Sequence, residues 1–346
     1  MTTDTADDEM MARALRLGAS VRASTPPNPW VGCVIETVDG SRFEGATEPA
    51  GGRHAEVVAL DAARAAGADT RGATVWVSLE PCSHHGRTAP CSEALLRAGA
   101  SRVVVAVEDP DPKVAGQGLA SLRAAGAEVV CGVQATDAAD LLAPYLHQRR
   151  SGRPYVVLKL AATLDGRTAA PDGSSRWITG PHARADVHAL RAESDAVLVG
   201  AGTVRADDPS LTVRDAPAPR GDPVRVVLGR APASAKVHPC LERTGRLEDV
   251  LDELGALGHI QLLVEGGAHV AHAFHHAGLV DRYVFYLAPA LMGGDDAPGL
   301  FAGAAAPTIG SAWRGRMRAV TRLGEDLRID VERDRSDGAA PGRGGL

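Results

Sequence analysis

Apolar and polar positions alternate along the first part of the chain in a way that predicts strands and helices in turn. The segments TVWVSLE (74–80) and RVVVAV (102–107) are apolar and β-branched, as buried strands are, whereas HAEVVALDAARAAG (54–67) shows the apolar spacing of a helix. Further helices are expected at 7–23 and 134–150, and a further strand at 128–130. This alternation predicts a layered α/β domain in which helices cover a sheet.

The alternation resumes after a charged, turn-forming stretch, RRSGRP (149–154), which we interpret as a linker. The segment 155–169 is expected to be a strand that runs into a Gly turn. Further strands are expected at 196–200, 224–229 and 260–265, helices at 181–195, 246–258 and 268–278, and a loop at 201–215. A chain of 346 residues is too long for one ordinary core. We therefore expect domains at 1–148 and 155–333, and a disordered tail at 334–346, whose polar and glycine-rich sequence cannot form a core.

Composition narrows the possible functions. A formal net charge of −6 argues against a nucleic-acid-binding groove, because binding a polyanion normally needs a basic surface. The chain has no apolar run of about 18 residues, and its first residues are acidic and polar, so we expect neither a membrane span nor a signal peptide, and a cytoplasmic location. The five cysteines lack the spacing of a disulfide framework, as expected in a reducing compartment.

Four residues form a pattern that indicates a catalytic zinc site. His54 and Glu56 begin a predicted helix, Cys82 follows a predicted strand, and Cys91 opens a second short helix. One imidazole and two thiolates suit a tetrahedral Zn²⁺ with an open fourth position, and the nearby helix N-termini favour thiolate over thiol. His-x-Glu followed by Pro-Cys and another Cys is the zinc-deaminase pattern, in which the metal activates water and the Glu moves protons.

Taken singly, each of these residues is more often structural than a ligand, so the joint pattern carries the interpretation. The two cysteines are separated by eight residues, where nucleobase-editing deaminases have two. The longer loop contains His84, His85 and Arg87, whose donor groups suit a phosphate better than a base within a strand.

Three other features each allow a structural and a functional interpretation. Asn28 lies between prolines, where it either forms a turn or presents a fixed amide to a polar ring edge. Gly266-Gly267 lies between an expected strand and an expected helix, and forms either a tight turn or a place for a phosphate. Lys159, in an expected strand, is either a surface lysine or a catalytic one.

With these motifs, the chain resembles the bifunctional riboflavin-biosynthesis deaminase/reductase family. The N-terminal half carries the resemblance in PNPWVGCVI, HAEVVAL, LEPCSHHGRTAPC and EDPDPKVAGQG. The C-terminal half carries it in LKLAATLDGRTA, SRWITG, LVGAGTVRADDPSLTVR, LLVEGGAHVAHAF and YLAPALMGG. The resemblance implies a cytidine-deaminase-like three-layer α/β/α domain followed by a dihydrofolate-reductase-like α/β domain.

The resemblance also implies two consecutive reactions on one phosphoribosylaminopyrimidine. The first half would remove the ring amine of 2,5-diamino-6-(5-phosphoribosylamino)pyrimidin-4(3H)-one by hydrolysis with Zn²⁺. The second half would use NADPH to reduce the ribosyl group to a ribityl chain. The predicted zinc site agrees with the first reaction, and the second depends on positioning, because the hydride chemistry belongs to the cofactor. A homodimer through the reductase domain is implied as well, with neither nucleic acid nor a membrane as partner.

The functional positions of the family are carried over residue by residue. Its zinc ligands correspond to His54, Cys82 and Cys91, its proton shuttle to Glu56, and its deaminase substrate contacts to Asn28, His84 and Arg87. Its reductase substrate side corresponds to Lys159, a catalytic candidate, and to Ser175, Arg191, Leu211, Arg214 and Glu265. Its cofactor side corresponds to Ala161, Trp177, Thr203, Asp207, Gly267, Ala268, His269, Val270, Ala271, His272 and Ala273. By their chemistry, Arg191 and Arg214 suit a phosphate, and Lys159 or Glu265 suits a proton transfer near C1.

The chain departs from the family pattern at three places. Ala46 stands where a His associated with substrate phosphate is common, Trp30 stands where a smaller or polar residue is usual and is expected at the pocket rim, and the segment after 224–229 is short. These departures leave two alternatives: a single-activity or paralogous pyrimidine deaminase whose second half only binds nucleotide, and a non-enzymatic binding protein. The complete zinc-site pattern argues against the second alternative.

Overall fold

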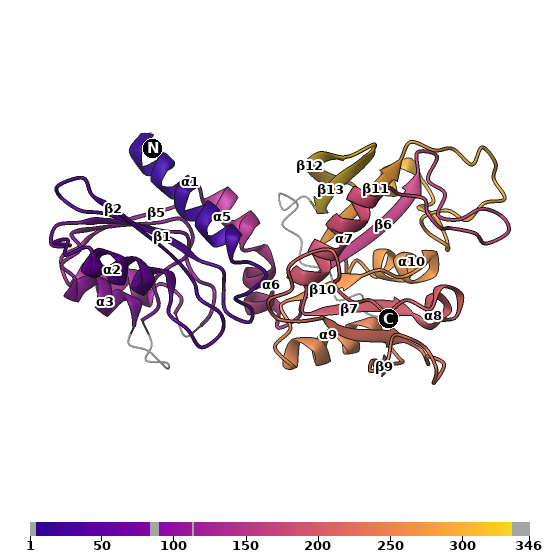
Figure 1. The fold of residues 1–346 in the computed structure, drawn as a ribbon, viewed down its shortest axis with the longest axis horizontal. Helices are drawn as coiled ribbons and strands as arrows, with labels where there is room; N and C mark the ends of the chain where they lie inside the picture. Colours follow the sequence, from indigo (N-terminus) through magenta and orange to yellow (C-terminus); the bar gives the residue numbers. More distant parts are fainter. Residues whose placement is uncertain (1–4, 84–89, 113, 334–346) are drawn as a thin grey trace. The chain divides into compact units, whose positions relative to one another are not determined.

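The computed structural model describes residues 5–83, 90–112 and 114–333, and the chain divides into two compact units, Met1–Arg153 and Pro154–Leu346 (Figure 1). The predicted phosphate contacts His84 and Arg87 lie outside the described residues, as does the tail at 334–346. Among the described residues, no helix combines the length and the apolar character that crossing a membrane requires.

The first unit is organised around a sheet with the strand order β2-β1-β3-β4-β5. Its strands are β1 (Gly32–Glu36), β2 (Arg42–Ala46), β3 (Thr74–Val77), β4 (Arg102–Val105) and β5 (Glu128–Cys131). Strand β1 pairs antiparallel with β2 and β3, whereas β3, β4 and β5 run parallel. Because β3 and β4 are parallel neighbours, the residues that follow them leave the sheet at the same edge.

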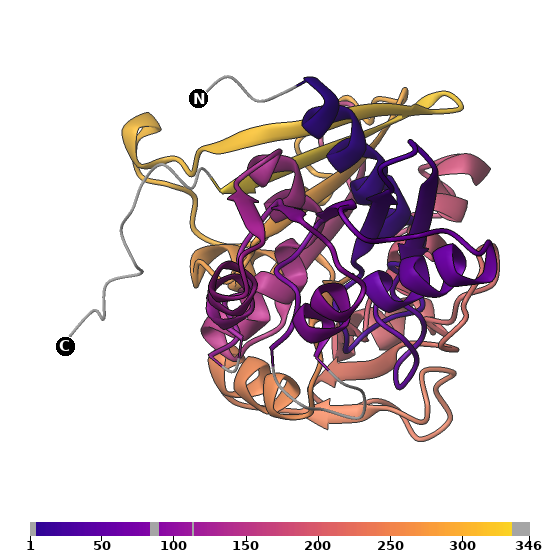
Figure 2. The same ribbon diagram turned by 90° about the vertical axis from the view of Figure 1, so that its left-hand side faces the viewer.

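Helices cover both faces of this sheet and complete three layers (Figures 1 and 2). The helices are α1 (Thr5–Ser20), α2 (Ala55–Ala65), α3 (Cys91–Arg97), α4 (Gln117–Ala124), α5 (Ala135–Leu141) and α6 (Ala143–Ser151). Met11 of α1 and Ala138 of α5 pack with Val34 and Trp76 on one face. On the other face α2 lies so close to β2 that a Cβ on Gly45 would meet the Ala55 carbonyl oxygen at 2.1 Å. Only glycine fits there.

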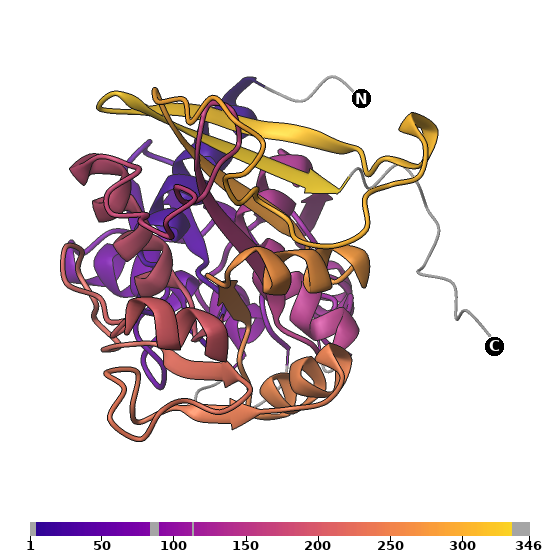
Figure 3. The ribbon, with the colours of Figure 1, turned by 90° about the vertical axis from the view of Figure 1, so that its right-hand side faces the viewer.

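The second unit contains a larger mixed sheet with the order β12-β13-β11-β6-β10-β7-β8-β9. Its strands are β6 (Tyr155–Thr163), β7 (Ala196–Gly200), β8 (Val224–Leu228), β9 (Leu241–Arg243), β10 (Gln261–Val264), β11 (Arg282–Ala288), β12 (Gly315–Leu323) and β13 (Asp326–Arg333). In this sheet order, the six neighbouring strands β11, β6, β10, β7, β8 and β9 are all parallel to one another. Strand β13 pairs antiparallel with β11 and β12. Figure 3 shows the yellow β12–β13 hairpin along one edge of the sheet.

One face of this sheet packs in a core with helices, and the other face lines a cleft. The helices are α7 (Pro181–Glu193), α8 (Ala201–Asp207), α9 (Leu247–Ala256) and α10 (Ala268–His276), with a short 3₁₀ turn η1 (Ile309–Ser311). Val156, Leu158 and Leu160 of β6 pack in one core with apolar residues of α9 and α10. Because side chains alternate along a strand, Lys159 and Ala161 point to the other face, where they line a cleft beside α7.

The two-domain α/β prediction is confirmed, and three local predictions need correction. The strand expected at 74–80 ends at Val77, so that the chain turns before it reaches Cys82. The helix expected at 134–150 is divided into α5 and α6, with Pro144 in the first turn of α6, where its missing N–H costs nothing. The loop expected at 201–215 begins with helix α8, which follows directly from the buried strand β7.

Candidate active sites

The three predicted zinc ligands come together at the edge of the first sheet. His54 is the residue before α2, Cys82 follows β3, and Cys91 is the first residue of α3. The Nδ1 atom of His54 lies 3.6 Å from Cys82 Sγ and 3.3 Å from Cys91 Sγ. The Cys91 backbone N–H donates to Cys82 Sγ over 3.3 Å. A helix N-terminus therefore supports one thiolate directly.

This donor set fits a tetrahedral zinc ion. With usual Zn–S and Zn–N bond lengths, a tetrahedral site separates a nitrogen ligand from a sulfur ligand by about 3.6 Å. The separations of 3.6 and 3.3 Å are close to that value, and all three ligand atoms lie within 4.8 Å of one another. Hydrogen bonds from Cys91 and His54 lower the pKa of Cys82, which favours the thiolate form that binds metal.

Glu56 lies in the first turn of α2, two residues after the His54 ligand, and its side chain lines the same cavity as His54 and Cys82. Only 4% of the residue is exposed. Burial raises the pKa of Glu56, with the negative charge of Cys82 acting in the same direction and His54 opposing it. A buried carboxyl group with a raised pKa beside a metal centre is suited to taking up and releasing a proton.

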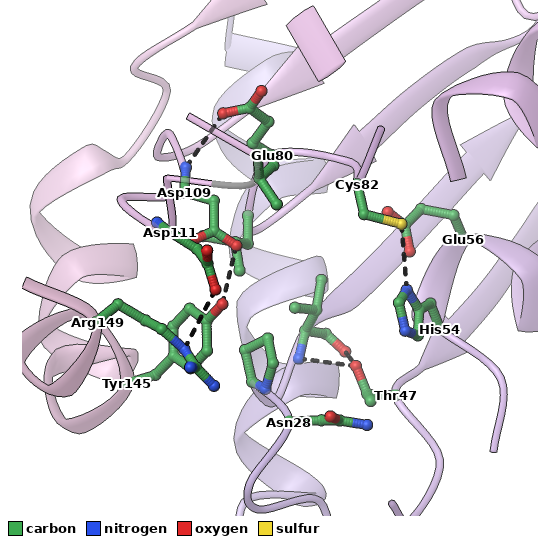
Figure 4. Close-up of a pocket in the computed structure, with 14 residues that line it drawn as sticks. Asn28, Thr47, His54, Glu56, Glu80, Cys82, Asp109, Asp111, Tyr145 and Arg149 are labelled. Carbon is green, nitrogen blue, oxygen red and sulfur yellow. Dashed lines mark hydrogen bonds and ion pairs between the residues drawn. The ribbon is translucent and has the colours of Figure 1, made fainter. Parts of the chain in front are cut away.

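Figure 4 shows the cavity that opens from this centre, with a volume of about 190 Å³. Asn28 lines it, as do Pro29 and Val31 on either side of Trp30. The expectation for Trp30 is wrong: its ring is 2% exposed and donates from Nε1 to the Leu141 carbonyl, so it packs in the interior and not at the pocket rim.

Several polar residues of this cavity were not anticipated from the sequence. Thr47, which follows Ala46, lines the cavity and accepts the Val31 N–H through Oγ1 at 3.1 Å. Glu80 lines it too and accepts backbone N–H groups at both ends of the segment after β4, including those of Asp109 (3.2 Å) and Gly118 (2.9 Å). The available signal was the occurrence of Glu80 and Asp109 a few residues after two neighbouring parallel strands, β3 and β4.

The far wall of the cavity comes from the segment after β4 and from α6. The Tyr145 hydroxyl donates to Asp109 Oδ2 at 3.0 Å, and burial raises the pKa of Asp109. The Arg149 guanidinium lies 3.7 Å from Asp111 and 5.1 Å from the centre of the Tyr145 ring. Helix α6 thus contributes to this site, although its last residues belong to the segment expected as a linker.

The second unit holds a buried group of charges on the cleft face of its sheet. Glu265, which follows β10, receives two hydrogen bonds from Arg191 of α7, at 2.6 and 3.0 Å. The Lys159 ammonium lies 3.7 Å from the same carboxylate. Burial acts to raise the pKa of Glu265, but Arg191 and Lys159 together outweigh burial and hold the pKa below its ordinary value. Lys159 and Glu265, the two alternatives expected for a proton transfer near the reacting carbon, lie next to each other.

Arg191 differs from the expectation in one respect. Its Nε and one terminal nitrogen bind Glu265, and its other terminal nitrogen donates to the Thr212 carbonyl at 3.0 Å. Three guanidinium nitrogens therefore have partners within the protein. Arg214 donates to Thr212 Oγ1 at 3.2 Å and lines the same cleft. It is the better placed of the two arginines for a phosphate.

The cleft consists of two cavities with shared walls, of about 640 and 490 Å³. Residues that line both include Lys159, Ala161, Ser175, Thr203, Asp207 and Glu265. Trp177 and Leu211 line the larger cavity only. The Trp177 ring is 70% exposed and lies 4.5 Å from the Arg184 guanidinium carbon. Leu211 is buried and has a φ of 55°, in the left-handed region that non-glycine residues rarely adopt.

The smaller cavity adjoins the glycine turn at the start of α10. Gly267, Ala268, His269 and Val270 line it, and the Gly267 N–H donates to Thr203 Oγ1 at 3.1 Å. A Cβ on Gly266 would lie 2.4 Å from Val270 Cβ, so glycine is required for this close turn. Ala271, also in the expected cofactor range, is fully buried among core residues and lines neither cavity.

His272 and Ala273 lie further along α10 and are not among the residues lining either cavity. Only the first turn of a helix directs free backbone N–H groups at a ligand, so these later residues of the expected range have no free N–H to offer a phosphate.

Comparisons with known families agree with this division of the chain. The family model for the cytidine and deoxycytidylate deaminase zinc-binding region matches residues 4–107, and the model for the RibD C-terminal domain matches residues 154–329. The riboflavin biosynthesis protein RibD of Escherichia coli (strain K12) is 40% identical over 362 residues, which cover 93% of this chain and 98% of that protein. The chain belongs to the RibD family.

Other RibD proteins resemble the chain over a similar length. The RibD protein of Mycobacterium tuberculosis (strain ATCC 25618 / H37Rv) is 44% identical over 94% of this chain and 96% of its own. The solved structure of Acinetobacter baumannii RibD (form 1) has a TM-score of 0.85 at 38% identity, covering 94% of this chain and 98% of that one. A Thermotoga maritima deaminase/reductase structure has a TM-score of 0.84 at 31% identity, covering 95% and 99%.

Membership of the RibD family confirms the predicted enzyme class. The chain is a bifunctional riboflavin-biosynthesis enzyme with a deaminase domain and a reductase domain. Its cofactors are Zn²⁺, for which His54, Cys82 and Cys91 form the matching donor set, and NADPH.

Proposed function

We propose that this RibD-family enzyme carries out two consecutive reactions on one phosphoribosylaminopyrimidine. The first is the hydrolytic deamination of 2,5-diamino-6-(5-phosphoribosylamino)pyrimidin-4(3H)-one, and the second is the reduction of the ribosyl group of the product to a ribityl chain. The observation that carries the proposal is the presence, in one chain, of a zinc-type donor set beside buried Glu56 and of a separate cleft lined by Lys159 and Glu265.

In the deamination, Zn²⁺ bound by His54, Cys82 and Cys91 supplies Lewis-acid activation of water. Glu56 accepts the proton of the attacking water on its carboxylate and delivers it to the nitrogen of the departing amine. The ring carbon gains the water oxygen, the second water proton moves to the adjacent ring nitrogen as the C=O bond forms, and the bond from carbon to the amine breaks to release ammonia. The buried position of Glu56 in the cavity that His54 and Cys82 also line supports this role, because the carboxyl group is kept close to the reacting groups.

Substrate recognition in the deaminase is assigned to Asn28, His84 and Arg87. Asn28 follows a double proline and lines the cavity near the ligands, which supports a role in reading the polar edge of the pyrimidine. His84 and Arg87 remain the predicted phosphate contacts on the basis of their donor chemistry.

In the reduction, NADPH supplies the hydride. We assign to Lys159 the delivery of a proton near C1 of the opened ribosyl group, and to Glu265 the positioning of Lys159. Arg191 orients Glu265 through two hydrogen bonds. Arg214 and Ser175, which line the cleft, are assigned to the substrate phosphate. The close Lys159–Glu265 pair supports this division of roles.

The cofactor is assigned to the smaller cavity of the cleft. Gly267 to Val270 present the start of α10 to the cofactor pyrophosphate, where backbone N–H groups and the helix dipole favour an anion. Ala161, Trp177, Thr203 and Asp207 complete this side.

We further propose domain limits of 1–148 and 155–333, a homodimer through the reductase domain, and a cytoplasmic location. The division of the chain between Arg153 and Pro154 supports the domain limits. Sedimentation of the purified protein would test the dimer.

One experiment separates this function from that of a deaminase whose second half only binds nucleotide. Purified protein is assayed for ammonia release from the diamino precursor and for NADPH oxidation with the precursor or with its deaminated product. The proposal predicts that the diamino precursor releases ammonia and that NADPH is oxidised with either compound. Ammonia release without NADPH oxidation on the deaminated product would favour the single-activity alternative.

A further inference from the structure

The connection between β8 and β9 in the second unit is unusual for a parallel strand pair. Residues Val226–Leu228 of β8 pair in parallel with Leu241–Arg243 of β9, so the chain has to cross over between them. Such crossovers usually contain a helix. The connection here, residues 229–240, consists of turns and irregular chain. It leads into a three-residue strand at the edge of the sheet, at the lower right in Figure 1.

Three metal-binding residue types alternate along the end of this connection. His238 and Cys240 belong to the irregular connection and Glu242 to β9, at intervals of two residues. Their ligand atoms all lie within 4.8 Å of one another. His238 Nδ1 is 3.5 Å from Cys240 Sγ, close to the separation of about 3.6 Å that a tetrahedral zinc ion imposes on nitrogen and sulfur ligands.

Partners outside the cluster orient two of its members. His238 Nε2 lies 3.0 Å from the Pro232 carbonyl oxygen, to which it can only donate. This bond leaves Nδ1, the nitrogen that faces Cys240, with a free lone pair in the neutral ring. Metal-binding histidines characteristically donate their other N–H to a carbonyl or carboxylate in this way. Glu242 is fixed similarly, since its Oε1 accepts the Ala231 N–H at 2.8 Å.

The charge next to the cluster is also compatible with a cation. Arg230 NH1 lies 3.9 Å from Glu242 Oε2, but its side chain is 89% exposed and is free to swing into solvent. Cys240 is partly buried and forms no disulfide. A borderline-soft ion such as Zn²⁺ suits one imidazole, one thiolate and one carboxylate, with water as the fourth ligand.

We propose that His238, Cys240 and Glu242 form a second zinc site, distinct from the deaminase centre, which stabilises the β8–β9 connection. The site replaces the packing that a crossover helix would provide. It also acts near the reductase cleft, because Lys236, two residues before His238, lines that cleft and is held by Asp208.

Zinc stoichiometry of the full-length protein tests this proposal. Protein saturated with Zn²⁺ is passed through a desalting column with a weak chelator, and bound zinc is measured by elemental analysis. We expect about two zinc ions per chain for the wild type, and about one for Cys240→Ser and for His238→Ala. Cys131→Ser removes an exposed cysteine elsewhere in the chain and serves as the matched control, which should keep about two.

A second measurement keeps the test independent of the deaminase metal. In the Cys82→Ser/Cys91→Ser variant, added Co²⁺ should still give the ultraviolet band of a thiolate–cobalt bond, and the additional change Cys240→Ser should abolish it. One zinc per wild-type chain, or an unchanged stoichiometry in Cys240→Ser, would overturn the proposal. Zinc that the weak chelator removes from the wild type down to one per chain would identify an adventitious ion only.

Discussion

Replacing Glu56 by Gln removes the proposed proton shuttle of the deaminase and leaves its zinc ligands unchanged. The change preserves the shape of a side chain that is 4% exposed, and it alters none of the three zinc ligands. A positioned acid–base group contributes about 10²–10⁴-fold. We therefore expect zinc binding to persist while ammonia release falls by at least about 10²-fold, equivalent to about 2.7 kcal/mol of transition-state stabilisation. Because Glu56 is buried, bulk water is poorly placed to replace it.

The same variant should gain stability when the metal is absent. Burial raises the pKa of Glu56, so the folded metal-free chain binds this proton more tightly than the unfolded chain does. Wild-type stability therefore declines as the pH rises from the ordinary glutamate pKa to the raised folded value, and stays lower above it. Glutamine carries no charge to bury. Metal-free Glu56→Gln should unfold at a higher temperature than wild type at neutral pH, and this difference should vanish below about pH 4.

The assay combines ammonia release, zinc content, thermal unfolding and NADPH oxidation with the deaminated intermediate. The last activity should be unchanged, because the residues assigned to it all lie in the second unit. Glu93→Gln, on the exposed side of α3, is a matched control that should retain deamination. Ammonia release within about threefold of wild type in Glu56→Gln, with zinc fully bound, would remove Glu56 from the mechanism.

Three further predictions concern the remaining site residues. Cys82→Ser and Cys91→Ser should each reduce zinc at the deaminase centre, measured as lost ammonia release that added Zn²⁺ restores poorly, because a hydroxyl is a weak ligand for zinc. Arg214→Ala should mainly raise the KM of the reductase, whereas Lys159→Ala should mainly lower its kcat; the reverse pattern in steady-state kinetics would exchange their roles. Glu265→Gln should destabilise the second unit by about 3 kcal/mol at neutral pH, because it leaves Arg191 buried without its counter-charge. Because the pKa of Glu265 is lowered in the folded chain, ionised Glu265 stabilises the wild type above the ordinary glutamate pKa. This contribution is lost as the pH falls through the lowered pKa. Denaturant unfolding curves of wild type and Glu265→Gln should therefore converge in acid.

Features with short, fixed spacing were predictable from the sequence. His54 and Glu56 are two residues apart at a helix start, so the chemistry of the residues nearly determines their relative positions. The β-α alternation predicted the α/β class, because apolar runs bounded by glycine and proline are strong local signals.

Features that depend on distant contacts were not predictable in this way. Trp30 was expected at a pocket rim, yet its indole binds the carbonyl of Leu141, more than a hundred residues away. Ala271 was expected beside the cofactor, yet the helix turns it towards the core. Arg191 was expected to bind phosphate, and only the fold reveals that its guanidinium donates two hydrogen bonds to Glu265. In each case the backbone motif was recognised correctly, but the direction of a side chain depends on tertiary packing.

The buried carboxylates of the two units show how partners separate structural from catalytic roles. Glu80 accepts four backbone N–H groups, those of Asp109, Gly116, Gly118 and Leu119, so its charge is used to hold the segment that forms one wall of the deaminase cavity. Glu265 is neutralised by two cations, which keeps it ionised and suits an electrostatic anchor for Lys159. Glu56 has the opposite environment, since burial favours its protonated form and its neighbours are metal ligands. Burial dominates the pKa of Glu56 in the metal-free chain, and its place beside the metal ligands supports the proposed shuttle role.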